Sequence, residues 1–73
     1  MSKLPQLKAN KVVKALTKLG FEKTRHTGSH LRMVHPDGRA TTIPIHSATL
    51  PKGTLKSILR QTKVTIEELK AKM

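Results

Sequence analysis

Few side chains in this sequence could transfer protons or bind a metal ion. The chain has no cysteine, tyrosine or tryptophan, and its four acidic residues and four histidines are Glu22, Asp37, Glu67, Glu68, His26, His30, His35 and His46. A two-metal hydrolase needs several carboxylates that converge on the metal ions, and a zinc site needs three or four ligands. Neither pattern is present, so we expect no metal and no small-molecule cofactor.

His30 is the best placed of the histidines. Residues 27–39 predict a β-hairpin in which Leu31 and Met33 alternate with His30 and Arg32. Because alternate residues of a strand face opposite sides, His30 and Arg32 should point outward together when the two apolar residues point inward. Pro36-Asp37-Gly38 has the residue types of a tight turn.

An exposed histidine beside an arginine is suited to cleaving RNA without a metal. RNA carries its own nucleophile, the 2′-hydroxyl, next to each phosphate. A histidine can serve as general base or acid, and Arg32 can stabilise the charge that develops on phosphorus. On the residues alone, however, a surface residue or a simple phosphate contact is the favoured interpretation of His30.

Size and charge limit the partners. The chain has 73 residues, enough for one domain (1–73), and a formal net charge of +11. Such an excess attracts polyanions, and nucleic acid is the favoured partner. An acidic protein, an anionic membrane surface, or lysine acting only for solubility are the alternatives. No apolar run could cross a bilayer and no secretory signal is visible, so we expect no membrane association and a cytoplasmic location.

The hydrophobic pattern predicts an α+β fold of two layers, with helices on one face of a three-stranded antiparallel sheet. We expect an irregular arm over residues 1–9 and a loop over 46–51. Asn10 is the predicted N-cap of the first helix and Thr49 a candidate for the second, whereas Thr65 and Glu68 match a capping box. The predicted helices are 10–19, 51–61 and 66–72, and the predicted strands are 21–26, 29–35 and 39–45.

Basic residues supply candidate RNA contacts. Lys52, Lys56 and Arg60 recur every four residues and should line one exposed helix face. The other candidates lie on the predicted strands and are Lys23, Arg25, Ser29 and Arg32. Because Phe21 is the single aromatic residue and is expected in the core, RNA should be recognised by shape and phosphate contacts and not by stacking.

Several motifs, taken in order, resemble those of the HicA (YcfA-like) toxin family. They span nearly the whole chain: Gly28-Ser29-His30, residues 35–39, Thr42-Ile43-Pro44 with His46, residues 52–55 and residues 57–61. The resemblance implies a fold similar to the double-stranded RNA-binding domain. It also implies a translation-independent mRNA interferase of a type II toxin–antitoxin module, held inactive by a cognate HicB-type antitoxin. The family's catalytic histidine corresponds to His30, with Gly28 and Ser29 as positioning residues.

The sequence therefore predicts a toxin that is a metal-independent endoribonuclease acting on single-stranded or weakly structured mRNA. Two alternatives stay open. The chain could be a basic RNA-binding domain that does not cut, or a structural partner whose basic face binds an acidic protein.

Overall fold

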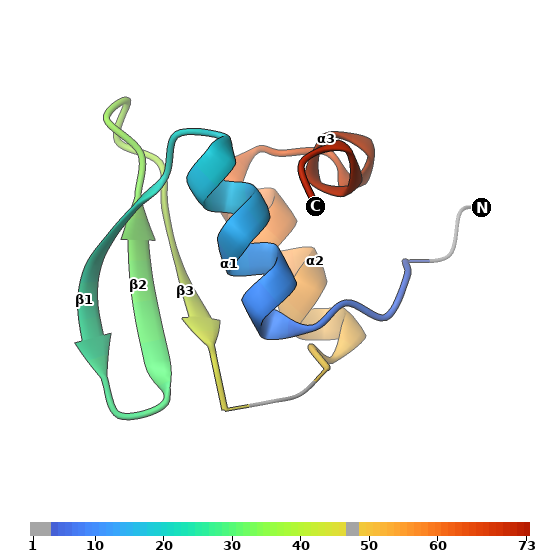
Figure 1. The fold of residues 1–73 in the computed structure, drawn as a ribbon, viewed down its shortest axis with the longest axis horizontal. Coiled ribbons are helices and arrows are strands. Elements are labelled where there is room, and N and C mark those ends of the chain that lie inside the picture. The colour runs from blue at the N-terminus through green and yellow to red at the C-terminus, as the bar shows by residue number, and fades with distance from the viewer. Residues whose placement is uncertain (1–3, 47–48) are drawn as a thin grey trace.

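Figure 1 shows the computed structural model, which describes residues 4–46 and 49–73. Within these residues the elements follow one another as a helix, three strands and two further helices, which confirms the predicted α+β layout. They are α1 (Ala9–Lys18), β1 (Glu22–Thr27), β2 (His30–Val34), β3 (Ala40–Pro44), α2 (Lys52–Thr62) and α3 (Ile66–Ala71). The described part of the chain contains no helix long and apolar enough to cross a membrane.

The three strands form one antiparallel sheet in the order β1-β2-β3. Pro44 is the last residue of β3, an edge strand, where its missing N–H leaves no gap in the ladder. The β1–β2 register shifts between Lys23 and Arg25, which marks a β-bulge. Because a bulge adds one residue to one strand, Lys23 and Arg25 no longer face the same side of the sheet.

The helices cover one face of the sheet and leave the other face open (Figure 1). On β2, Leu31 and Met33 are buried whereas His30 and Arg32 are exposed, which confirms the predicted alternation. The core lies between the two layers, and Phe21 is within it as predicted. Its largest fully buried apolar side chains are Val12, Leu16, Phe21, Met33, Ile43, Leu55, Ile58 and Leu69.

Both predicted N-caps of the longer helices are wrong. The first helix begins at Ala9 with Lys8 as its N-cap, because the buried Ala9 packs into the core as part of the helix. The N-cap of α2 is Pro51, whose carbonyl accepts the N–H of Leu55 at 2.9 Å. Neither helix has a side-chain cap, so the nearby polar residues Asn10 and Thr49 do not mark where the helices begin.

The third helix begins as its capping box predicts. The Glu68 N–H donates to the Thr65 hydroxyl at 3.1 Å, and the Thr65 N–H donates to the Glu68 carboxylate at 3.0 Å. Two other predicted segments lie partly outside the described residues. In the predicted arm, residues 1–3 are outside, and Leu4 and Leu7 pack half-buried against the core. In the predicted loop, residues 47–48 are outside.

The turn after β2 is fixed by packing around Phe21. The ring of His35 meets the Phe21 ring edge-on at 5.1 Å, and the Arg39 guanidinium lies 5.2 Å from its centroid. Gly20 has a φ of +102°, and a Cβ there would come within 2.8 Å of His35 Nε2. Glycine is therefore required at this position both by the backbone angle and by the close approach.

We expect stability to fall as the pH drops below about 4. The Arg39 N–H donates to Asp37 and lowers the pKa of that carboxyl, and the Thr65 N–H does the same for Glu68. A carboxyl whose pKa is lowered by folding stabilises the native state at pH values above its pKa in the unfolded chain. This stabilisation is lost as the pH falls through the pKa of the carboxyl in the folded state. Urea unfolding between pH 3 and 6 should show a flatter pH dependence for Asp37→Asn/Glu68→Gln than for the wild type. Parallel curves for the two proteins would contradict this assignment.

Candidate active site

The turn between β1 and β2 positions the site. Gly28 and Ser29 form a two-residue hairpin loop between Thr27 and His30, which are cross-strand partners. Gly28 has a φ of +56° whereas Ser29 is not in the positive region, a pattern typical of a type II′ turn. The Ser29 carbonyl also accepts the N–H of Ile45 at 2.7 Å, which joins the loop to the chain after β3. These contacts fit the positioning role predicted for Gly28 and Ser29.

His30 is the first residue of β2 and lies on the open face of the sheet. Its neighbours across the sheet are Thr27 on β1 and Pro44 on β3. The side chain is exposed, and in residues 4–46 and 49–73 the imidazole takes part in no side-chain hydrogen bond or ion pair. An imidazole in this environment is accessible to a substrate and can exchange protons with it.

Two arginines lie next to each other on the same face. Arg32 is the direct cross-strand partner of Arg25, and both are exposed. Like charges placed opposite each other on two strands destabilise a sheet. The Arg32 guanidinium also donates to the Thr42 hydroxyl at 3.2 Å, which holds it across the sheet. This arrangement favours the binding of an anion such as a phosphate.

The structure places Lys23 away from His30 and the two arginines. Its partner across the strands is Met33, which is buried, so Lys23 faces the helices and not His30. In a regular strand Lys23 and Arg25 would share a face, because they are two residues apart. The β-bulge between them reverses that relation.

The basic residues of α2 also lie apart from the open face. Lys52, Lys56 and Arg60 are exposed on a helix of the opposite layer. However, α2 begins at the end of the molecule where the β1–β2 turn and the end of β3 also lie (Figure 1). Lys52, at the start of this helix, therefore shares one end of the molecule with His30.

The other histidines have different surroundings. His35 is half-buried and structural, since its Nδ1 accepts the N–H of Asp37 at 3.1 Å. His26 pairs with Leu31 and so faces the helical side, whereas His46 is exposed after β3. Among the residues described, no three His, Asp or Glu side chains gather as metal ligands would.

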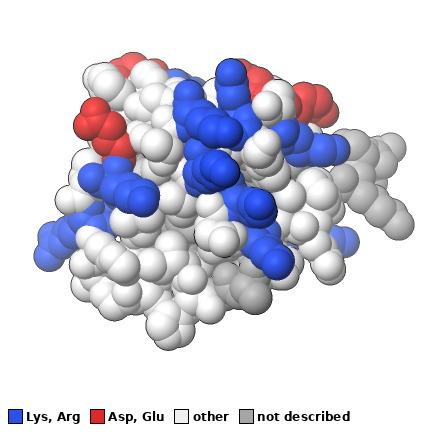
Figure 2. All heavy atoms as spheres, viewed as in Figure 1, with Lys and Arg blue, Asp and Glu red and all other residues white. Residues whose placement is uncertain are grey.

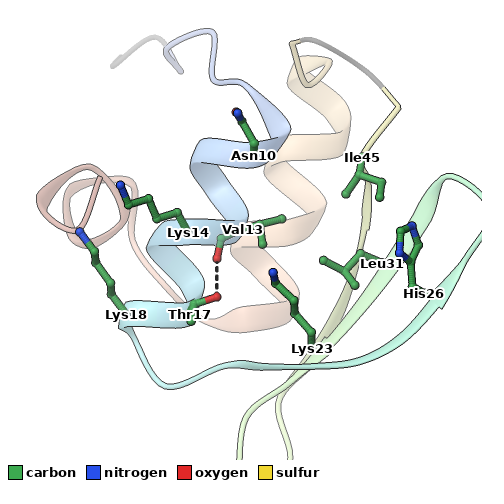
Figure 3. A pocket seen from close by; sticks show the side chains of 9 residues that line it. All are labelled: Asn10, Val13, Lys14, Thr17, Lys18, Lys23, His26, Leu31 and Ile45. Atoms are coloured by element: carbon green, nitrogen blue, oxygen red, sulfur yellow. Dashed lines mark hydrogen bonds between the residues drawn. The ribbon is translucent and has the colours of Figure 1, made fainter.

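A groove between α1 and β1 was not predicted from the sequence. It has a volume of about 610 Å³ and contains side chains from both the helix and the sheet (Figure 3). In the sequence, the only feature that indicated this groove is the spacing of the lysines on α1, which are three or four residues apart. The groove itself depends on how far β1 extends past the helices, which local patterns do not specify. The lining residues are Asn10, Val13, Lys14, Thr17, Lys18, Lys23, His26, Leu31 and Ile45.

Together these features define a small basic α+β protein with an exposed histidine on an open, arginine-bearing sheet. The model of the family described as HicA toxin of bacterial toxin–antitoxin matches residues 9–64. The match runs from α1 to just beyond α2 and covers most of the chain, so the protein belongs to the HicA toxin family. It is the toxin of a toxin–antitoxin system, and the family implies a cognate antitoxin as partner. No curated protein matches the chain.

Proposed function

We propose that this HicA toxin is an endoribonuclease that cleaves mRNA without a metal ion, with His30 as the proton-transfer group. The observation that supports this most is the exposure of His30 on the same sheet face as Arg25 and Arg32. Gly28 and Ser29 form the loop that immediately precedes His30. Among the described strand residues, His30 is the one histidine that shares the open face with these two arginines.

In the proposed reaction, His30 removes the proton from a ribose 2′-hydroxyl. The 2′-oxygen attacks the adjacent phosphorus, and the bond from phosphorus to the 5′-oxygen breaks. The leaving 5′-oxygen takes up a proton, which protonated His30 or water can supply. Arg32 and Arg25 stabilise the negative charge on the phosphorane oxygens. The products are a 2′,3′-cyclic phosphate and a 5′-hydroxyl.

The distribution of basic residues supports RNA as the substrate. A net charge of +11 favours a polyanion, because binding releases its counterions. An RNA strand that leaves His30 around the end of the molecule would next reach Lys52, with Lys56 and Arg60 further along α2. We expect these three residues to add affinity without choosing the bond that is cut.

A labelled RNA incubated with the purified protein in excess EDTA tests this proposal against a binding domain that does not cut. We expect cleavage products in EDTA, at a rate similar to that in magnesium. An RNA whose 2′-hydroxyls are replaced by hydrogen should bind but stay intact. A shifted band with no cleavage, over a range of RNA sequences, would instead support the RNA-binding alternative.

Replacing Arg25 should have opposite effects on stability and on RNA binding. We expect Arg25→Thr to stabilise the fold by about 0.2–1 kcal/mol, because it removes the like-charge contact with Arg32. The same change should weaken RNA binding and reduce the slope of log Kd against log salt by about 1. Urea unfolding and fluorescence anisotropy measure the two effects.

Lys72→Thr is the matched control for Arg25→Thr. Lys72 is exposed, follows α3 with a negative φ and carries the same charge. It should change the salt slope by clearly less than Arg25→Thr does. Equal effects of the two variants on RNA binding would mean that net charge, and not the arginine pair, determines affinity.

A further inference from the structure

The groove between α1 and β1 lies on the side of the sheet opposite to His30. Lys23 and His26 of β1 line one side of it, with Lys23 extending toward α1, whereas Lys14 and Lys18 line it from α1 with side chains that extend away from the strands (Figure 3). None of these four side chains is paired with a carboxylate among the described residues, where the close basic neighbours of a carboxylate are His35 and Arg39 beside Asp37. The rim of the groove is therefore cationic and accessible.

The floor of the groove is aliphatic. Val13, Leu31 and Ile45 line it between the helix and the sheet. Val13 and Leu31 belong to the hydrophobic core, and Ile45 packs half-buried against it. Covering Ile45 and the small exposed part of the two core residues removes apolar surface from water and favours an occupant with aliphatic side chains.

The floor and the rim together favour a protein segment over RNA. An aliphatic floor cannot solvate a phosphate, and no Phe, Tyr or Trp side chain is among the lining residues for a base to stack on. A segment with alternating apolar and acidic side chains satisfies both parts, because its apolar residues meet the floor while its carboxylates meet the lysines.

The charge on the rest of this face also favours an acidic protein segment. Figure 2 shows lysine and arginine side chains gathered in a band over the helical layer, with the acidic side chains at its margin. Lys11, Lys14 and Lys18 are exposed along one side of α1. An acidic partner would reduce the mutual repulsion of these charges.

We propose that this groove is the docking site of the antitoxin, which fills it with an acidic, amphipathic segment. The inference rests on membership of the toxin family and not on RNA cleavage by His30. It also places the docking site beside the free edge of β1.

The test measures the affinity of the purified full-length toxin for its purified cognate antitoxin by calorimetry. Lys14→Glu/Lys18→Glu reverses two charges at the rim, and Lys52→Glu/Lys56→Glu reverses two at the same spacing on α2. We expect the rim pair to weaken antitoxin binding at least about 10-fold more than the α2 pair, since like charges in an interface are costly. Ile45→Gln should also weaken antitoxin binding, and circular dichroism melts establish that each variant is folded.

A second measurement uses the wild-type complex and needs no variant. Lysine acetylation followed by mass spectrometry should show that the antitoxin protects Lys14, Lys18 and Lys23 more than it protects Lys56. Equal weakening by both charge-reversed pairs, or equal acetylation of all four lysines, would overturn the proposal. So would rim variants that lose RNA affinity while they keep antitoxin affinity, because the groove would then be an RNA site.

Discussion

His30→Ala should lower the rate of RNA cleavage by at least about 100-fold, the usual contribution of a general acid or base. The side chain is exposed and makes no hydrogen bond or ion pair in the described part of the chain, so its removal should leave the fold unchanged. The affinity for RNA should change little, because arginines and lysines supply most of the charge. Single-turnover cleavage and fluorescence anisotropy measure the two quantities separately. In cells, the variant should no longer arrest growth.

Two further substitutions separate proton transfer from phosphate contact. His30→Gln supplies a hydrogen-bonding side chain and His30→Lys supplies a positive charge, but neither glutamine nor lysine is suited to proton transfer near neutral pH. Both should be as inactive as His30→Ala, and added imidazole should partly restore cleavage by the alanine variant. Substantial cleavage by His30→Lys would show that His30 contributes charge and not proton transfer.

Phe21→Ala should be the most destabilising single change in the chain. Phe21 is buried, and its ring contacts both His35 and Arg39. Truncation of a buried phenylalanine costs about 3–5 kcal/mol. A domain of 73 residues has a total stability of about 4–11 kcal/mol. We therefore expect a large unfolded population at 37 °C, visible as lost helical signal in circular dichroism.

Leu19→Ala provides the comparison for Phe21→Ala. Leu19 is a neighbouring apolar residue that is half-buried against the same core. Its truncation should cost clearly less, because less apolar surface is lost. If Phe21→Ala cost no more than Leu19→Ala in urea unfolding, the packing around Phe21 would not have the importance assigned to it.

Local patterns predicted most of the fold. The alternation around Leu31 and Met33 located β2 and correctly placed His30 outside, since a strand has a fixed period of two. The capping box at Thr65 located α3 for a similarly local reason. The two predicted N-caps were wrong because no polar side chain determines where α1 and α2 begin. The burial of Ala9 determines the start of α1, and the geometry of Pro51 determines the start of α2.

The surroundings of the candidate site depend on features that sequence spacing does not encode. A single bulge sends Lys23 to one side of the sheet and leaves Arg25 on the other. The groove exists because β1 is an edge strand whose helix-facing residues, such as His26, stay exposed. Both features follow from how strands pair and layers overlap, which only the assembled fold defines.

The most direct test of the central claim is the chemical analysis of the ends left by cleavage. A synthetic RNA of one sequence is digested by the purified toxin in EDTA, and its fragments are identified by mass spectrometry. We expect 2′,3′-cyclic phosphate or its hydrolysed form on one fragment and a 5′-hydroxyl on the other, with no products from His30→Ala. A 5′-phosphate, a requirement for added metal, or the same products from His30→Ala would contradict the proposed role of His30.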